Sequence, residues 1–259
     1  MPFVSPEIFA KQIIASVQEY SILSWRAIAN LYSRPRYWAD IYTQMDSIGV
    51  GSMPIVVLTG FFTGCVLALQ SATSLEAFGS VSLTGNLVAL SMVKELGPVL
   101  TGLMVSGRNA SGMASEIGSM RVTEQIDAMR ALGTDPVRKL VTPRLYATVF
   151  MLFFLTIVSD AVGIAGGALV SVTLMGLNAS SYFHNSYRAL QYGDVVQGLT
   201  KPLFSGFIIA TVGCFFGMTT KGGTQGVGKA TTQAVVYSSV FIIIVDFIVS
   251  RAMIGIFGR

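Results

Sequence analysis

The sequence predicts an all-α integral membrane protein with five membrane-spanning helices. Of its 259 residues, 52% are hydrophobic and only 12% are charged, whereas soluble domains average about 25% charged residues. No charge occurs between residues 47 and 75, a stretch long enough to cross a bilayer, which takes about 20 apolar residues. The 27 glycines suit closely packed membrane helices. Together these observations exclude a soluble enzyme.

Five apolar runs define the expected spans, at about residues 49–70, 82–106, 145–177, 194–217 and 233–257. The second run is interrupted by Lys94, Glu95 and the Gly97-Pro98 pair. We expect a kink there, because the proline ring clashes with the carbonyl four residues back. The third is expected to start at Thr142 as N-cap and Pro143 as the first helical residue.

Residues 1–46 carry four basic and four acidic side chains between apolar residues at helical spacing. We expect an amphipathic helix at the membrane surface, and an ordinary amphipathic helix packed on protein remains an alternative. Four aromatic residues suit the headgroup zone: Trp25, Tyr32, Tyr37 and Trp38. The first residues lack the pattern of a cleavable signal. Cys65 and Cys214 lie in apolar runs and are expected to pack as small hydrophobic residues.

Basic residues predict the orientation of the chain. Twelve of them fall in residues 1–46, 108–144 and 218–232, against two, Arg188 and Arg259, on the other side. Because basic residues favour the cytoplasmic side, we expect the N-terminus in the cytoplasm and the C-terminus outside. The scattered basic residues form no patch typical of nucleic-acid binding.

Residues 108–144 are expected to form a cytoplasmic loop that presents a short amphipathic helix. Its apolar side comprises Val122, Ile126, Met129 and Leu132, and its other side comprises Glu124, Asp127 and Ala131. Gly133 should end this helix, and Asp135-Pro136 should start another. Such a helix suits docking into a partner's groove, although packing on the membrane surface explains the pattern equally well.

The run EIGSMRVTEQIDAMRALGTDPVRKLVTPR, from Glu116 to Arg144, resembles the signature of the MlaE-type permease family. LVALSMVKELGPVLTGLMVSGR and GGTQGVGKATTQAVV extend the resemblance to about residues 45–259. That family supplies the membrane subunits of lipid-transporting ABC systems associated with MCE proteins. The resemblance implies a permease that works as a dimer or pseudo-dimer, with a coupling helix at about 122–132 seated on a separate ATPase subunit.

The resemblance also implies partners and sites. The partners are an ATPase dimer, a periplasmic MCE-domain substrate-binding protein, a second copy of the chain, phospholipid and the inner membrane. ATP and magnesium would bind the ATPase, so we expect no cofactor and no catalytic or metal site in this chain. The expected ATPase contacts are Glu124, Gln125, Asp127, Ala128, Met129, Leu132, Gly133, Asp135 and Pro136.

Lys94 and Glu95 lie inside the second span, where ionisable groups usually face a cavity or a partner, and the resemblance implies a lipid cavity near the dimer interface. Lys94 and Glu95 would meet polar headgroups, and acyl chains would contact Leu67, Leu69, Leu75 and Phe78. Pairing within one subunit, for instance of Lys94 with Asp160 or Asp246, is the structural alternative. A different class of function, an ion- or proton-coupled carrier, would use Lys94, Glu95, Asp160 and Asp246 as a relay. A non-transporting scaffold is a third possibility.

Two further patterns have simpler explanations. The GxxxG pairs Gly60/Gly64, Gly163/Gly167 and Gly213/Gly217 predict close helix packing, with a dimer interface as the sharper alternative. GTQGVGK at residues 223–229 matches part of a phosphate-binding loop, but Ala230 replaces the magnesium-binding Ser or Thr and no strand precedes it. His184 is the only histidine, which leaves no metal-ligand spacing or Ser-His-Asp set to argue from.

Overall fold

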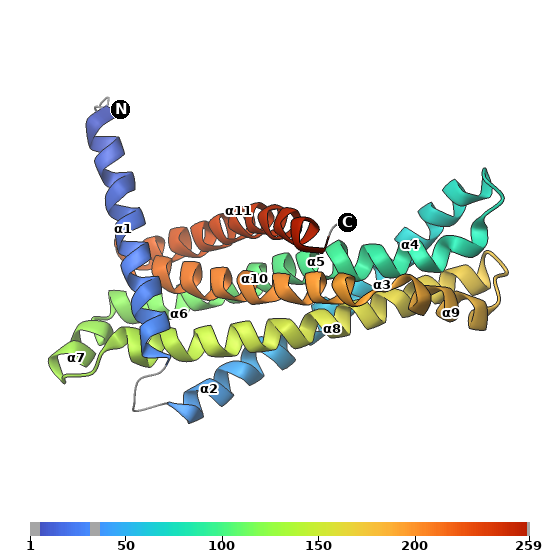
Figure 1. The fold of residues 1–259 in the computed structure, drawn as a ribbon. Coiled ribbons are helices and arrows are strands. Elements are labelled where there is room, and N and C mark those ends of the chain that lie inside the picture. Colours follow the sequence, from blue (N-terminus) through green and yellow to red (C-terminus); the bar gives the residue numbers. More distant parts are fainter. Residues whose placement is uncertain (1–5, 32–36, 258–259) are drawn as a thin grey trace.

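The computed structural model describes residues 6–31 and 37–257, and these contain helices and turns but no strand. Tyr32, one of the expected interfacial aromatic residues, lies outside them. The long helices run side by side as an elongated bundle, and α1 (Pro6–Asn30) leaves one end of it at a steep angle (Figure 1). The all-α fold is therefore confirmed.

Five helical segments are long and apolar enough to cross a membrane, as the sequence predicts. The first comprises α2 (Trp38–Met45), the π-helix η1 (Asp46–Val50) and α3 (Gly51–Glu76). The second comprises η2 (Val81–Leu83), α4 (Thr84–Ser91), η3 (Met92–Leu96), α5 (Gly97–Val105), η4 (Ser106–Ala110) and α6 (Ser111–Val122). The remaining three are η5 (Val137–Val141) with α8 (Thr142–Thr173), α10 (Tyr192–Met218) and α11 (Gly223–Phe257).

These segments extend well beyond the expected spans. The second has 42 residues, roughly 60 Å of helix at 1.5 Å per residue, which is about twice the hydrocarbon thickness. Much of the expected 108–144 loop is therefore helix, with only α7 (Gln125–Ala131) and turns between α6 and η5. No Gly-Pro break or capping residue stops the helix between 108 and 122, so the polar sequence continues it.

The third segment begins differently from the prediction. Thr142 does not cap a helix, because η5 runs directly into α8 and Val141 before it is already helical. The Thr142 hydroxyl instead donates to the Val137 carbonyl at 3.3 Å. Asp135 is the residue that caps this segment, since its carboxylate accepts the Val137 N–H at 3.0 Å.

Glycines bring the long helices into backbone contact. A Cβ at Gly64 on α3 would overlap the Gly163 backbone on α8, and a Cβ at Gly167 would lie 2.8 Å from Val88. On α10, a Cβ at Gly217 would lie 2.7 Å from the Ile117 side chain of α6. All three GxxxG pairs therefore pack within this chain, as the simpler explanation predicts.

The second half of α1 packs on the bundle. Leu23 and Ala27 are buried there, and the Tyr20 and Thr211 hydroxyls lie 2.9 Å apart in a hydrogen bond. Trp25 points the other way and is 72% exposed. This helix thus has one face on protein, and its predicted contact with the membrane surface involves the opposite face.

Candidate functional site

A network of five charged side chains joins three helices in the apolar part of the bundle. Lys94 of η3 pairs with Asp194 of α10 at 2.9 Å. Lys201 of α10 pairs with Glu95 of η3 and, at 3.0 Å, with Asp246 of α11. Because these charges would be costly alone in hydrocarbon, their mutual pairing holds the second, fourth and fifth segments together.

The break in the second segment lets the two neighbouring charges reach different partners. Residues Met92–Leu96 form a π-helical turn in which the Gly97 N–H bonds the Met92 carbonyl. Pro98 follows and has no N–H to donate. Lys94 meets Asp194 and Glu95 meets Lys201, and both of these partners lie on α10. The helix continues through this turn with altered hydrogen bonding, and the kink expected there stays a prediction.

The alternative that Lys94 forms an ion pair within one subunit is confirmed, but the partners expected for it are wrong. Lys94 pairs within the subunit, but with Asp194 instead of Asp160 or Asp246. Asp246 pairs with Lys201, whose side chain is 2% exposed. The sequence analysis missed Asp194 and Lys201 as site residues, although Asp194, Gln197 and Lys201 recur at the three- and four-residue spacing of one helix face.

Glu95 is both anchored and accessible. Its carboxylate binds Lys201 and accepts hydrogen bonds from the Gln197 amide at 3.3 Å and the Ser250 hydroxyl at 3.1 Å. Nevertheless, 45% of its side chain is exposed. A carboxylate held by three neighbours on one side remains open on the other, which suits contact with a bound polar group.

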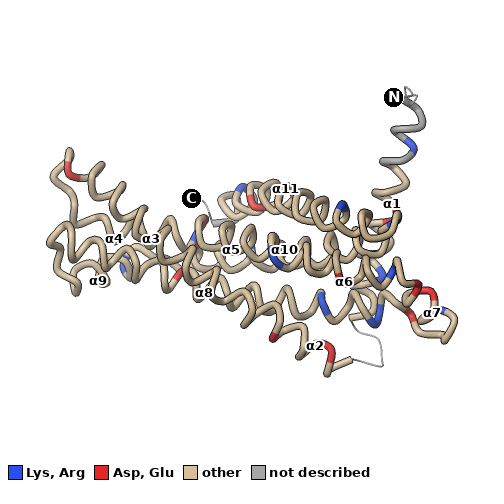
Figure 2. The backbone as a smooth tube through the Cα atoms, turned by 180° about the vertical axis from the view of Figure 1, so that it is seen from behind, with Lys and Arg blue, Asp and Glu red and all other residues tan. Residues whose placement is uncertain are grey.

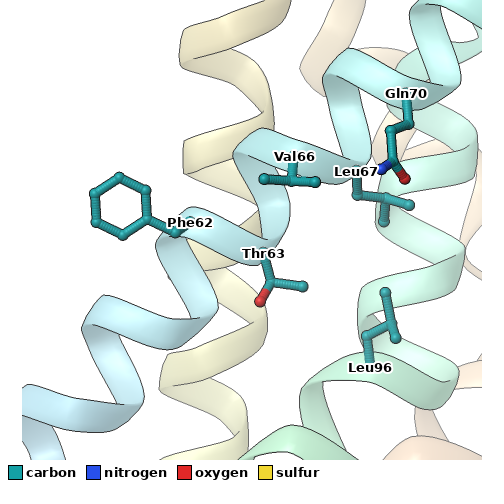
Figure 3. Close-up of a pocket in the computed structure, with 6 residues that line it drawn as sticks. All are labelled: Phe62, Thr63, Val66, Leu67, Gln70 and Leu96. Atoms are coloured by element: carbon teal, nitrogen blue, oxygen red, sulfur yellow. The ribbon is translucent and has the colours of Figure 1, made fainter.

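An apolar pocket with a volume of about 330 Å³ lies between α3 and the second segment. Its lining comes from α3 and from the neighbour of Glu95: Phe62, Thr63, Val66, Leu67, Gln70 and Leu96. Leu67 and Leu96 face one another across it (Figure 3). Of the four predicted apolar cavity residues, the pocket contains Leu67. The others lie outside it: Leu69 and Phe78 are exposed on the chain's surface and Leu75 is partly buried.

The predicted coupling helix is present as α7, slightly shorter than expected. It starts after Glu124, which has a left-handed backbone (φ 60°), and ends before Gly133 (φ 77°). Gly133 thus terminates the helix as the sequence predicts. Glu124 is unusual, because a left-handed conformation strains a residue with a side chain and such strain tends to occur at functional sites.

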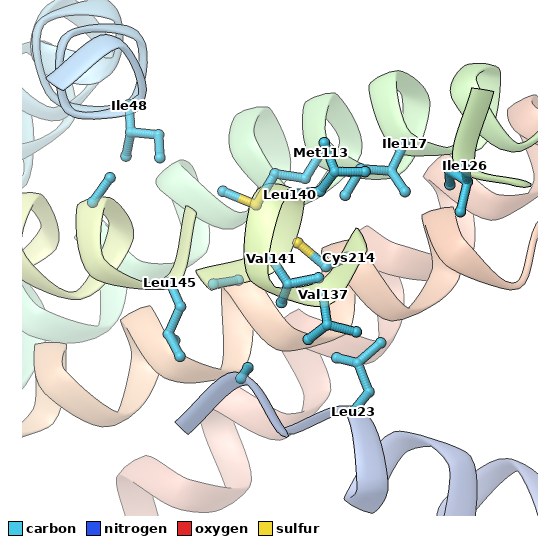
Figure 4. Close-up of a cluster of buried hydrophobic side chains, with 13 residues drawn as sticks. Leu23, Ile48, Met113, Ile117, Ile126, Val137, Leu140, Val141, Leu145 and Cys214 are labelled. Atoms are coloured by element: carbon cyan, nitrogen blue, oxygen red, sulfur yellow. The ribbon is translucent and has the colours of Figure 1, made fainter. Parts of the chain in front are cut away.

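One residue anchors α7 to the rest of the molecule. Ile126 is completely buried in a cluster that joins α1, α6, α7, η5, α8 and α10 (Figure 4). Met129 packs against the same cluster, whereas Leu132 is 84% exposed and Val122 is partly exposed. The apolar side predicted for this helix is therefore divided, with its middle facing the core and Leu132 facing outward.

The other predicted coupling residues divide in the same way. Gln125, Asp127, Ala128 and Gly133 are exposed, as is Glu124. Asp127 binds Arg121 at 2.6 Å and Arg130 at 3.3 Å. Asp135 is exposed but caps η5, and Pro136 is buried. Most of the predicted coupling residues before Asp135 thus lie on an outward surface. Asp135 and Pro136 instead stabilise the turn that leads into η5.

Charged residues concentrate at the α7 end of the bundle, whereas the α4 and α9 (Ala179–Ala189) end has few (Figure 2). Buried Arg144 binds exposed Glu116 at 2.7 Å. Lys139 binds Asp40 and lies 4.3 Å above the Tyr37 ring. Both pairs tie the ends of long helices together. The charge-rich segments of the sequence thus gather at one end of the bundle.

The described residues include no cluster of His, Cys, Asp and Glu that could hold a metal ion. The segment GTQGVGK forms the first turns of α11, and a Cβ at Gly226 would overlap the Lys221 carbonyl. The segment is therefore helical from its start.

The family model described as Permease MlaE matches residues 41–252 of this sequence. The chain belongs to the MlaE permease family. The resemblance of the 116–144 motif to this family is thus confirmed. The matched residues 41–252 include both the charged network and α7. Membership of this family, together with the five long apolar helices, makes the chain a multi-pass membrane protein and a permease subunit.

Relatives of this MlaE permease cover nearly its full length. A probable ABC transporter permease protein of Rickettsia bellii (strain RML369-C) is 41% identical over 240 residues, 93% of each chain. The intermembrane phospholipid transport system permease protein MlaE of Haemophilus influenzae is 32% identical over 249 residues, 95% of each chain. The Arabidopsis thaliana protein TRIGALACTOSYLDIACYLGLYCEROL 1, chloroplastic, is 36% identical over 88% of this chain and 65% of its own.

Proposed function

We propose that this MlaE permease moves phospholipid-like lipids between the inner membrane and a periplasmic MCE-domain partner, driven by a separate ATPase subunit. The observation that carries the proposal is an apolar pocket lined by Leu96, the residue that follows the partly exposed, charge-paired Glu95. Such a combination suits an amphiphile. The name of the Haemophilus influenzae relative supports phospholipid as its class.

The two halves of the site would serve the two halves of a lipid. Acyl chains would lie against Leu67 and Leu96 and continue past Leu69, Leu75 and Phe78, where apolar side chains cost nothing to cover with hydrocarbon. The headgroup would lie near Lys94 and Glu95, whose side chains are 26% and 45% exposed. A positive and a negative group side by side suit a phosphate with an amine or hydroxyl substituent.

A second copy of the chain would complete this cavity. Exposed apolar side chains cover α3 and α11, among them Leu58, Phe62, Val66, Phe247 and Ile248. Exposed apolar surface suits either lipid or another copy, and the pocket opens on α3. Because the three GxxxG pairs are already used inside the chain, the second copy would meet these larger side chains.

The ATPase would bind the outward surface of α7. Glu124, Gln125, Asp127 and Ala128 offer polar contacts there, and Leu132 offers an apolar side chain to a groove. Ile126 and Met129 link this surface to the core, so a force on α7 would reach α6 and α10 as a rigid-body displacement. ATP and magnesium would be held by the partner. The charge-rich end would face the cytoplasm, with the N-terminus inside and the C-terminus in the periplasm.

A reconstitution experiment tests this function. The tagged full chain is expressed with its neighbouring genes, purified and placed in vesicles that contain a fluorescent phospholipid. We expect an ATPase and an MCE protein to copurify, and we expect lipid transfer to the MCE protein to require ATP. A complex without an ATPase, or transfer driven by a proton gradient in the absence of ATP, would replace this proposal with the carrier.

A further inference from the structure

Asp160, in the middle of α8, differs from the other acidic residues of the long helices. Its side chain is buried, and its Oδ1 atom has no hydrogen-bond partner. No Lys or Arg among the described residues forms an ion pair with it, whereas Glu95, Asp194 and Asp246 all have one. An ionised carboxylate in this place would lack any compensation for its lost hydration.

The carboxyl group of Asp160 lies against the break in the second segment. A Cβ at Gly97 would overlap Oδ1, so the carboxyl occupies the space that a side chain at residue 97 would fill. The same Cβ position is 2.9 Å from the Met92 carbonyl oxygen. A backbone acceptor therefore lies beside the carboxyl, in the π-helical turn that carries Lys94 and Glu95.

The opposite side of this turn is held just as closely. A Cβ at Gly198 of α10 would overlap the Val93 carbonyl, which lies in the turn whose hydrogen bonding Pro98 interrupts. The interrupted turn is thus enclosed between a glycine of α10 and the carboxyl of Asp160. Small changes at either contact would move the two charged side chains between them.

We propose that Asp160 is an intramembrane proton-binding site, whose neutral acid form fills the notch at Gly97 and holds the interrupted turn so that Lys94 and Glu95 meet their partners. The protonated carboxyl supplies an O–H donor beside the backbone carbonyls of the turn. It also avoids placing a further negative charge next to a network that already contains three carboxylates.

The charged groups of the interrupted turn and their partners are already engaged. Lys94 and Glu95 on η3 bind Asp194 and Lys201 on α10. Lys201 also binds Asp246 of α11, and Cys65 on α3 donates its thiol hydrogen to the Gly166 carbonyl. An ionised Asp160 would have to take a cation from one of these pairs. Deprotonation would therefore disturb the network instead of merely adding a charge.

Infrared spectroscopy of the full chain in lipid vesicles tests the protonation state directly. At neutral pH we expect a carbonyl-stretch band of a protonated carboxylic acid that is present in the native chain and absent from Asp160→Asn. Carboxyl groups that are in the same state in both proteins cancel in this difference. The absence of the band from the native spectrum would overturn the proposal.

Thermal unfolding against pH tests the positioning role. The neutral form is the one that fits, so the folded chain should hold this proton to a higher pH than the unfolded chain, and stability should fall as the pH rises through that interval. Asp160→Asn keeps a neutral donor of the same shape and should remove this alkaline loss, whereas Asp160→Leu should lower the unfolding temperature at every pH. Equal alkaline losses in the native chain and Asp160→Asn would contradict the role. Neither measurement involves lipid transfer, so this inference and the proposed function fail separately.

Discussion

The two charged regions of the molecule differ in what surrounds them. In the intramembrane network, Lys201 is 2% exposed and binds two carboxylates from two other segments. At the α7 end, Asp127 binds Arg121 and Arg130, and all three side chains are at least a third exposed. Pairs of the first kind are expensive to break because they leave a buried charge. Pairs of the second kind contribute little to stability and can exchange partners. The network therefore suits a fixed site, and α7 suits a contact that forms and changes.

The largest effect should follow from Lys201→Met. It leaves Glu95 and Asp246 side by side without their shared cation, and because Glu95 is 45% exposed the loss should be smaller than the cost of about 3–5 kcal/mol for a fully buried pair. We expect poor yield and a much lower unfolding temperature in detergent. The exposed Lys229→Met serves as the matched control. Adding Glu95→Gln and Asp246→Asn to Lys201→Met should recover stability, and an unaltered unfolding temperature in the single variant would show that the network is not structural.

The next effect concerns Lys94→Ala combined with Glu95→Ala. This change removes one positive and one negative charge, leaves Lys201 bound to Asp246, and leaves Asp194 as acceptor of the Gln191 N–H. We expect the complex to assemble while ATP-driven phospholipid transfer falls at least tenfold. Transfer at the native rate would remove these residues from the lipid site.

Charge reversal at Glu124 and Asp127 should act at the other region. Replacing both by Lys alters an exposed surface, so the unfolding temperature should change by only a degree or two while less ATPase copurifies. Glu76→Lys, exposed at the far end of the bundle, provides the control. Full recovery of ATPase with the doubly reversed chain would place the contact elsewhere.

The smallest effect should come from Arg130→Ala. Its pair with Asp127 is exposed and joins neighbouring turns of one helix, so its loss costs about 0.5 kcal/mol or less. Thermal unfolding and ATPase copurification should both stay near native values. A loss comparable with that of Lys201→Met would mean that the two regions do not differ as proposed.

The features set by local sequence were predictable. The charge-free stretch after Asp46 indicates a span, Pro98 indicates a break, and Gly133 ends α7 because it adopts a positive φ. These depend on periodicity and on single residues with special backbone properties. They required no knowledge of neighbouring helices.

Features that depend on helix rotation and contact were not predictable. The expected partners of Lys94 were Asp160 and Asp246, and the relative rotation of the helices instead selects Asp194. In the same way, α7 has an apolar side in sequence, but burial of Ile126 and exposure of Leu132 follow from where the helix docks. The sequence did not predict the length of α6, because its polar residues are typical of a loop. In the structure these residues continue the apolar helix that precedes them.

The second membrane segment has one further consequence. Each of its π-helical turns, η3 and η4, inserts about one extra residue and so rotates the following helix by about 100°. The face presented by the chain therefore changes phase twice along one continuous rod. Its first portion, α4, packs on α9, its middle, α5, packs on α8 and α10, and its last, α6, packs on α10 and α11. A rotation applied near α7 would thus move a different set of neighbouring helices at each level of the bundle.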